Sequence, residues 1–196
     1  MNRAVVMLAA LGALCLIGGN AGAQGYPGDI MSGGPSFFGG PRYFGGGGAG
    51  PIPRQTVYFQ ANYAPGTIVI DTAERRLYLV EPGGRALRYG IGVGRDGFRW
   101  SGVHRVSAKR EWPGWTPPAE MRRRRPDLPV HMAGGIDNPL GARAIYLGST
   151  LYRIHGSNEP ETIGQAVSSG CFRMTNEDVV DLYSRVSVGA TVVVKN

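Results

Sequence analysis

The stretch that decides the fold is Ile154-His-Gly-Ser157, followed after a loop by Val167-Ser-Ser-Gly-Cys-Phe-Arg-Met174. A thiol with an ordinary pKa of about 8.5 is only slightly ionised at neutral pH, so a nucleophilic cysteine needs a nearby base or positive charge. Histidine exchanges protons near neutral pH, and His155 ends a predicted strand that would hold its ring rigidly. Cys171 lies 16 residues later, after a loop that can return to the same place. Cys171 and His155 are therefore candidates for nucleophile and general base, with a chance pairing as the competing interpretation.

Small residues lead up to the thiol. Ser169 and Gly170 precede Cys171, and glycine lets a backbone come close to a substrate carbonyl. The backbone N–H groups of this segment can point at a developing oxyanion. The second ring nitrogen of His155 also needs a partner, and no Asp or Asn is obviously placed to provide one. The backbone carbonyl of Gly156 is the candidate partner.

The first 23 residues have the features of a secretory signal peptide. Arg3 supplies a positive start, and Ala4 to Gly18 is an uncharged apolar run that is too short to span a bilayer comfortably. Ala21-Gly22-Ala23 matches an A-x-A cleavage site. The alternative is an N-terminal membrane anchor. We expect a signal peptide over 1–23 and a mature protein in the periplasm or secreted to the cell envelope, without a transmembrane segment.

The cysteine count makes Cys171 a candidate functional residue. The chain has two cysteines, and Cys15 would leave with the signal peptide. Lipid attachment through Cys15 is disfavoured because the bulky Leu14 precedes it. Cys171 would then lack a disulfide partner in its own chain, which indicates an intermolecular disulfide, a free thiol with a function, or an inert buried thiol.

The charge favours an anionic partner. The formal net charge is +7, and the mature chain without Arg3 would carry 20 basic against 14 acidic residues, or +6. Such a charge suits nucleic acid, anionic lipid headgroups or a carboxylate-rich wall polymer. The sequence has no RNP, helix-turn-helix or zinc-finger pattern, so we expect no nucleic acid partner. The spacing of His104, His131 and His155 matches no metal motif, so no metal site is expected.

Residues 24–55 form a predicted disordered linker. Gln24 to Pro53 contains 11 Gly and 5 Pro in 30 residues. Such a composition buries too little apolar surface to offset the entropy of ordering the chain. The remaining residues, 56–196, are the predicted folded domain.

Short apolar runs separated by turn residues predict an antiparallel, mostly β domain. The expected strands are Thr67–Asp71, Arg76–Val80, Ala86–Val93, Gly102–Lys109, Ala144–Leu147, Tyr152–His155 and Thr191–Val194. One helix is also expected. Thr175 can cap it, and Val179, Leu182, Tyr183 and Val186 follow at the spacing of a single apolar stripe.

A long segment without periodicity, Glu111 to Gly141, separates the expected strands. Loops of this length are usually functional or disordered, and Trp112 and Trp115 argue against full disorder. It contains the basic run Arg122 to Arg125. A solvated loop is the ordinary interpretation of such a run, and attraction to an anionic envelope is the alternative.

The motifs taken together resemble the L,D-transpeptidase catalytic domain family (YkuD-like). The family pattern is a His-Gly pair, a loop, Ser-His-Gly-Cys or Ser-Ser-Gly-Cys, and an Arg two residues past the Cys. The resemblance runs from about Thr67 to Val194, and this chain has Ser169 where much of the family has a second histidine. The motifs that carry it are Ile68-Val-Ile-Asp71, Leu77-Tyr-Leu-Val80, Gly90-Ile-Gly-Val-Gly94, Trp112-Pro-Gly-Trp-Thr-Pro117, Asn138-Pro-Leu-Gly141, Ile154-His-Gly-Ser157, Ser168–Met174 and Asn176-Glu-Asp-Val179.

The resemblance implies a β-sandwich with one helix after the catalytic cysteine, and acyl transfer between peptidoglycan stems without metal or cofactor. Cys171 would attack the L-centre carbonyl of a tetrapeptide stem, and D-alanine would leave with His155 managing the protons. The N–H groups of Ser169, Gly170 and Cys171 would hold the oxyanion. Because Ser169 replaces a histidine, the general base would be His155 alone.

Each candidate substrate contact also has a structural interpretation. Arg173 is expected to pair with a carboxylate of a diaminopimelate-type stem, or with Asp178 or Glu177. The loop from Trp112 to Asn138 is expected to form a lid over the cleft. Its residues Trp112, Trp115 and Asn138, together with Tyr146, are candidate substrate contacts, with core packing as the alternative for the aromatic side chains.

The resemblance leaves the acyl acceptor open. It would be another stem peptide, giving a 3→3 crosslink, an outer-membrane protein to be anchored, or a free D-amino acid. Two other functions remain as alternatives: a cysteine L,D-carboxypeptidase or hydrolase of the wall, and a wall-binding module without catalysis.

Overall fold

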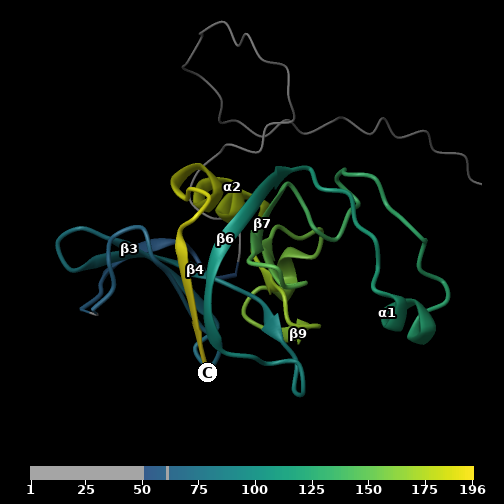
Figure 1. The fold of residues 1–196 in the computed structure, drawn as a ribbon, viewed down its shortest axis with the longest axis horizontal. Coiled ribbons are helices and arrows are strands. Elements are labelled where there is room, and N and C mark those ends of the chain that lie inside the picture. Colours follow the sequence, from purple (N-terminus) through teal and green to yellow (C-terminus); the bar gives the residue numbers. More distant parts are fainter. Residues whose placement is uncertain (1–50, 61) are drawn as a thin grey trace, which may run out of the picture. The chain divides into compact units, whose positions relative to one another are not determined.

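The computed structural model describes residues 51–60 and 62–196. The expected signal peptide and most of the expected linker lie outside the described residues. The strands are β1 Gln55–Tyr58, β2 Ile68–Asp71, β3 Arg76–Glu81, β4 Arg85–Gly90, β5 Val93–Gly94, β6 Gly102–Glu111, β7 Arg143–Leu147, β8 Arg153–His155, β9 Ala166–Ser168, β10 Phe172–Arg173 and β11 Thr191–Lys195 (Figure 1). The helices are α1 Ala119–Arg124 and α2 Asn176–Arg185, with a 3₁₀ turn at Pro160–Thr162.

One nine-stranded sheet, in the order β1-β4-β3-β2-β11-β6-β7-β8-β10, forms both layers of the domain. Strand β6 belongs to both halves, because its first part pairs with β11 and its later part with β7. The register shifts between Val106 and Ala108, where an irregularity bends the strand. The expected mainly β sandwich is confirmed, with its two layers joined through β6 rather than separate.

The expectation of an antiparallel domain is correct for the hairpins and wrong for three pairs. Strands β11 and β2, β10 and β8, and β5 and β9 run parallel. Parallel neighbours need long connections. Here the loop after His155 connects β8 to β10, whereas β2 and β11 are separated in the chain by nearly the whole domain.

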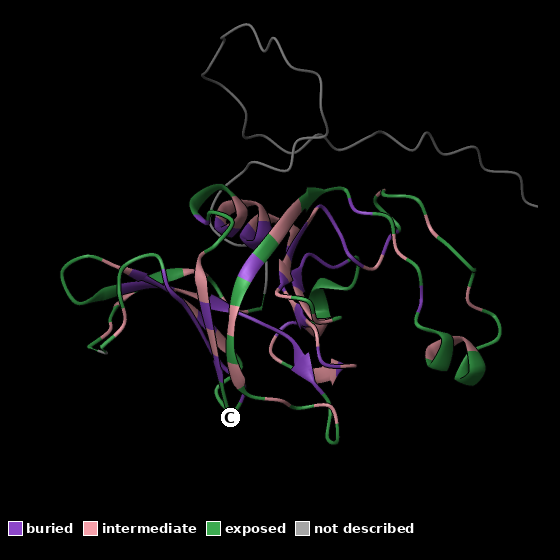
Figure 2. Ribbon diagram, in the orientation of Figure 1, coloured by how far each residue is buried: buried purple, intermediate pink, exposed green. Residues whose placement is uncertain are grey.

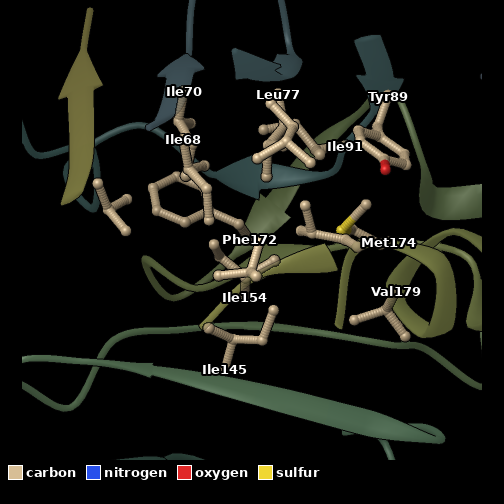
Figure 3. Close-up of a cluster of buried hydrophobic side chains, with 14 of the residues drawn as sticks. Ile68, Ile70, Leu77, Tyr89, Ile91, Ile145, Ile154, Phe172, Met174 and Val179 are labelled. Carbon is tan, nitrogen blue, oxygen red and sulfur yellow. The ribbon is translucent and has the colours of Figure 1, made fainter. Parts of the chain in front are cut away.

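The core lies between the two halves of the sheet. Figure 3 shows Ile68, Ile70 and Leu77 on one side and Ile145 and Ile154 on the other, with Phe172 and Met174 between them. Strand β2 is buried at all four positions, because it is covered on both faces and paired on both edges. Figure 2 shows buried segments in the central strands, whereas α1 has none. Burial of this apolar surface is the main source of stability.

Helix α2 occupies the position that the sequence predicted. The Thr175 hydroxyl accepts a hydrogen bond from the Asp178 amide at 3.2 Å, which caps the first turn. At the other end, Lys109 Nζ on β6 donates to the carbonyls of Tyr183 and Val186, both at 2.6 Å. These bonds satisfy two of the exposed carbonyls at the end of the helix and fix it against the sheet.

Helix α1 was missed by the sequence analysis. It lies in the segment predicted as a loop, which reaches away from the sheet (Figure 1). None of its six residues is buried, and no side chain caps its first turn. Without an apolar stripe there was no periodicity to detect. None of the helices in the described ranges is long and apolar enough to cross a membrane.

The chain packs against the domain before residue 56. Strand β1 begins at Gln55, the last residue of the expected linker. Arg54 lies 3.4 Å from a carboxylate oxygen of Asp178 and 3.3 Å from one of Asp181, both on α2. Ile52 packs closely against Gly90: a Cβ added at residue 90 would lie only 2.6 Å from the Cβ of Ile52.

Replacement of Phe172 by alanine is expected to lower the free energy of unfolding by about 3–5 kcal/mol. Its ring is 1% exposed and lies between the sheet halves, so truncation leaves a cavity. Urea denaturation of both proteins measures the change. The control is Val103→Ala at a site that is 69% exposed, where a change within about 0.5 kcal/mol is expected. Equal losses in the two variants would contradict this placement of the core.

Candidate active site

The pairing of β8 with β10 sets the directions of the site's side chains. Ile154 lies opposite Phe172, and His155 lies opposite Arg173. Successive side chains on a strand point to opposite faces. Since Ile154 and Phe172 enter the core, His155 and Arg173 face the other side of the sheet.

Cys171 extends this arrangement by one residue. It directly precedes β10, at the level of Arg153 on β8, so both side chains lie on the same face as His155. Cys171 and His155 are thus diagonal neighbours. With strands about 4.8 Å apart and a rise of about 3.3 Å per residue, their Cα atoms lie roughly 8 Å apart. Side chains of this length can meet across that separation.

A cleft of about 710 Å³ opens on this face. Arg153, His155, Cys171 and Arg173 line the side formed by the sheet. The opposite side is formed by residues 115–122 and 124, which belong to the segment predicted as a loop and to α1. The segment expected as a lid therefore supplies a wall of the cleft.

The His155 ring is held in one tautomer. Its Nδ1 lies 2.6 Å from the Gly156 carbonyl oxygen. A carbonyl only accepts hydrogen bonds, so Nδ1 must carry the hydrogen, which leaves Nε2 free to accept a proton. The contact is the one expected from the sequence.

His155 is neutral at physiological pH. Its side chain is 5% exposed, and burial lowers its pKa to about 3. The hydrogen bond to Gly156 opposes this shift, while the positive charges of Arg173 and Arg153 add to it. A ring that is neutral and has a free nitrogen can act as a base.

Asn176 fixes the backbone that holds His155. A Cβ at residue 156 would clash with Oδ1 of Asn176, and that oxygen accepts a hydrogen bond from the Ala142 amide at 2.8 Å. Gly156 is therefore required by close packing against the start of α2. The sequence motif contained Asn176, but gave no sign of this function.

Cys171 is a half-buried free thiol. Its Sγ donates to the Leu151 carbonyl oxygen at 3.8 Å. Burial raises the pKa of the thiol, and this effect outweighs the charge of Arg153, the hydrogen bond from the Arg153 amide and the charge of Arg173, which all act in the opposite direction. The thiol is therefore protonated at neutral pH, beside a neutral imidazole.

Ser168 organises the loop before the thiol. Its hydroxyl accepts from the Gly170 amide at 3.1 Å and donates to the Cys171 carbonyl at 2.6 Å. The Gly170 amide, expected among the oxyanion donors, is therefore already used within the loop. The amides of Ser169 and Cys171 have no acceptor among the described residues. These two amides are the available donors.

Two of the expected substrate contacts line the cleft. Trp115 does so on the loop side, where its backbone pairs with Met132 in both directions at 2.8 Å. Arg173 lines the sheet side, and its partner is Glu159 at 2.7 Å, not Asp178 or Glu177 as the alternative had it. Arg173 thus ties the strand to the loop between His155 and Cys171.

Three other expected contacts are not part of the cleft lining. Asn138 is 1% exposed. Its side-chain NH₂ donates to the carbonyls of Met132 and Ala133, and its Oδ1 accepts from the Leu140 amide. Asn138 therefore stabilises the conformation of the loop from its interior. Tyr146 lies under the guanidinium of Arg153, at 5.4 Å from its ring centre. Trp112 is 43% exposed on the outside of the same loop.

The cleft is strongly cationic, a property that the spacing of the arginines in the sequence does not indicate. Arg122, Arg124, Arg153 and Arg173 line it, with Glu120 as the one carboxylate. The Nε atoms of Arg122 and Arg153 are buried without a partner in the described residues. In the run from Arg122 to Arg125, Arg122 and Arg124 therefore line the cleft, whereas Arg123 and Arg125 do not.

Two arginines of that run, Arg123 and Arg125, do not line the cleft, and both are paired with carboxylates. Arg123 lies 3.7 Å from Glu120, and Arg125 lies 2.6 Å from Asp127. In the described part of the chain, no group of three or more His, Cys, Asp or Glu could hold a metal ion. His131 instead lies 3.0 Å from the Thr116 hydroxyl, and His104 lies edge-on to Trp100.

The family model and the curated relatives that match this chain all belong to one family. The family described as "YkuD: L,D-transpeptidase catalytic domain" matches residues 65–194. The probable L,D-transpeptidase ErfK/SrfK of Escherichia coli K12 is 41% identical over 134 residues, which are 64% of this chain and 42% of that protein. The chain spans less than half the length of this relative and of two others from the same organism, the probable L,D-transpeptidases YcfS and YbiS.

Solved structures agree on the fold. An L,D-transpeptidase from Mycobacterium smegmatis has a TM-score of 0.54 at 17% identity, and the match covers 66% of this chain and 58% of that one. A crystal structure described as a probable carnitine operon oxidoreductase caia from Brucella melitensis is 51% identical over 70% of this chain and 89% of that one. Its TM-score of 0.49 is too low to support an inference.

The stability of the protein is expected to fall as the pH drops from about 6.5 to about 4. Within this window the unfolded chain takes up a proton at residue 155, while the folded protein, with a pKa of about 3 there, excludes it. His155→Gln removes this linkage, so its melting temperature should fall less over the same range. Thermal melts at several pH values test this.

The matched control for this experiment is His131→Gln, which alters an exposed histidine and should keep the wild-type pH dependence. If His155→Gln and the wild type lose stability in parallel, residue 155 is not a buried neutral histidine.

Proposed function

The chain belongs to the L,D-transpeptidase catalytic-domain (YkuD) family, and from this premise we propose that Cys171 and His155 transfer acyl groups of peptidoglycan stem peptides. The observation that carries the proposal is the shared sheet face, where a thiol and a neutral imidazole with a free Nε2 line one cleft. The free Nε2 is the nearby acceptor that a protonated thiol needs to become a nucleophile.

The first half of the reaction forms a thioester. The thiol turns from the Leu151 carbonyl toward His155, and its proton moves to Nε2 as sulfur attacks the L-centre carbonyl of a tetrapeptide stem. The carbonyl π electrons move onto oxygen. When this oxyanion collapses, the C–N bond breaks, and the nitrogen of D-alanine takes the proton from the imidazolium.

The second half transfers the acyl group. An acceptor amine attacks the thioester and gives a proton to Nε2. The C–S bond breaks as the new amide forms, and the sulfur recovers its proton from the imidazolium. The acceptor is the amine of a second stem, of an outer-membrane protein, or of a free D-amino acid.

The oxyanion is held by the Ser169 and Cys171 amides. Both lack an internal acceptor, whereas the Gly170 amide is bonded to Ser168. Donors that are fixed before the reaction stabilise developing charge without reorganisation. Ser168 therefore serves the site by fixing the loop.

The arginine-rich cleft suits an acyl donor with several carboxylates, as a peptidoglycan stem has. The Nε atoms of Arg122 and Arg153 have no partner among the described residues, and guanidinium N–H groups form strong, charge-assisted hydrogen bonds to carboxylates. Arg122 and Arg153 are the proposed carboxylate contacts, with Trp115 along the same cleft. We place the reaction in the periplasm, with residues 1–23 as a signal peptide, 24–55 as a linker and 56–196 as the catalytic domain.

The first experiment follows acylation of Cys171. Intact mass after incubation with a carbapenem should show one covalent adduct, absent in Cys171→Ala. In His155→Ala the rate should fall about 10²–10⁴-fold, since the proton transfer is lost. An adduct that persists in Cys171→Ala would contradict the assignment of the nucleophile.

Product analysis separates transfer from hydrolysis. With tetrapeptide muropeptides as substrate, a transpeptidase gives crosslinked dimers together with D-alanine, whereas a hydrolase gives only trimmed monomers. A protein that binds sacculi, gives neither product and binds equally well as Cys171→Ser would be a wall-binding module instead.

A second experiment tests the cationic cleft. Arg122→Gln should raise KM for a tetrapeptide donor about tenfold and leave kcat nearly unchanged, because a ground-state contact to a carboxylate is lost. Its control is Arg125→Gln, which removes a nearby charge that pairs with Asp127, and neither of these two residues lines the cleft. If both variants shift KM equally, the effect is general electrostatics rather than a contact.

A further inference from the structure

Trp100 makes a directed contact to the loop that precedes the thiol. Its indole Nε1 donates to the Gly170 carbonyl oxygen at 2.8 Å. In a trans peptide the carbonyl of one residue and the N–H of the next point in opposite directions. With the Gly170 oxygen held on the Trp100 side, the Cys171 N–H must point away from Trp100.

Cys171 lines the cleft, whereas Trp100 lies outside the lining and packs against the core. The Gly170 carbonyl is therefore held by a group outside the cleft, and the Cys171 N–H points away from that group. The Cys171 amide has no acceptor among the described residues, so it is free for a group in the cleft.

Trp100 is itself held rigidly. Its ring stacks on Tyr152 with centroids 4.4 Å apart and planes 13° apart. Phe172, the residue after Cys171, lies 5.4 Å away on a tilt, and His104 meets the indole edge-on at 5.1 Å. An indole enclosed in this way has one direction for its N–H.

Gly170 is shaped to receive this contact. Its φ of +107° lies in a region that favours glycine, and a Cβ would come within 2.5 Å of the Tyr152 ring. The residue is buried. The indole N–H therefore supplies the partner that a buried carbonyl requires.

We propose that Trp100 is a positioning residue, which fixes the peptide between Gly170 and Cys171 so that the Cys171 amide donates to the oxyanion. This rests on the proposed acyl transfer, since only that reaction develops an oxyanion next to Cys171. Trp100 does not touch the substrate and acts through the backbone.

Two reactions of the Cys171 sulfur distinguish positioning of the amide from a change in the ionisation or accessibility of the thiol. Attack on a carbapenem carbonyl forms a C–S bond while the π electrons move onto oxygen, so it needs the amide. Collapse of this oxyanion breaks the ring C–N bond, and the nitrogen takes up the proton that left the sulfur through His155. Attack on iodoacetamide forms a C–S bond as iodide leaves with the C–I electrons, and no oxyanion develops. Loss of amide positioning should slow the first reaction and spare the second.

Trp100→Phe keeps an aromatic ring for the Tyr152 stack but removes the N–H. Carbapenem acylation should slow by about 10–100-fold, somewhat less than the loss of a whole oxyanion donor. Alkylation by iodoacetamide should stay within about twofold, because thiol ionisation and access control it. With a tetrapeptide donor, the loss should appear in kcat rather than KM.

Two further proteins keep the test decisive. His104→Phe changes the neighbour at the indole edge but leaves the N–H contact, and should acylate like the wild type. If Trp100→Phe does not fold, 3-benzothienylalanine at position 100 retains the size of the indole and replaces its N–H by sulfur. It should show the same selective loss of acylation.

The outcomes are distinct. A normal acylation rate without the indole N–H would overturn the proposal, and so would an equal slowing of acylation and alkylation. A wild-type protein that is alkylated but never acylated would contradict the proposed function itself, and this inference with it. Selective loss of acylation in both Trp100 replacements, with His104→Phe unaffected, supports it.

Discussion

The site depends on the parallel pairing of two very short strands. Because Ile154 and Phe172 must both enter the core, the residues that alternate with them, His155, Arg173 and the adjoining Cys171, are directed to the opposite face. A shift of one residue in register would send the imidazole into the apolar interior and the isoleucine into the cleft. Core packing and site geometry are thus set by the same constraint.

Burial then decides the charge state of the reacting groups. Two arginines on the same face favour the thiolate and disfavour the imidazolium, but desolvation is the larger effect on each group. Both groups are therefore neutral at rest. An uncharged pair is inexpensive to bury, and charge develops only when a substrate carbonyl is there to receive the sulfur.

The sequence was informative where local chemistry is decisive. The hairpins, the cap of α2 by Thr175 and the carbonyl partner of His155 follow from strand alternation, capping preferences and the absence of a nearby acid. The contacts that join distant segments could not be read in this way. Trp100 precedes Gly170 by 70 residues, and only the tertiary fold brings the indole to that carbonyl. The position of Arg153 in the cleft could not be predicted, because strand alternation shows which face a side chain occupies but not which residues it contacts.

The ion pairs at Arg54 give the domain a defined point of mechanical attachment. Arg54 contacts two carboxylates on α2, and Ile52 packs beside Gly90 and Gly164. Helix α2 begins three residues after β10 ends. A pull on the chain from the side of residue 51 would therefore load α2 and the Gly164 loop directly. Tension applied there would reach the helix that follows the Cys171 segment at the same time as β4, because Ile52 also packs against Gly90 on that strand.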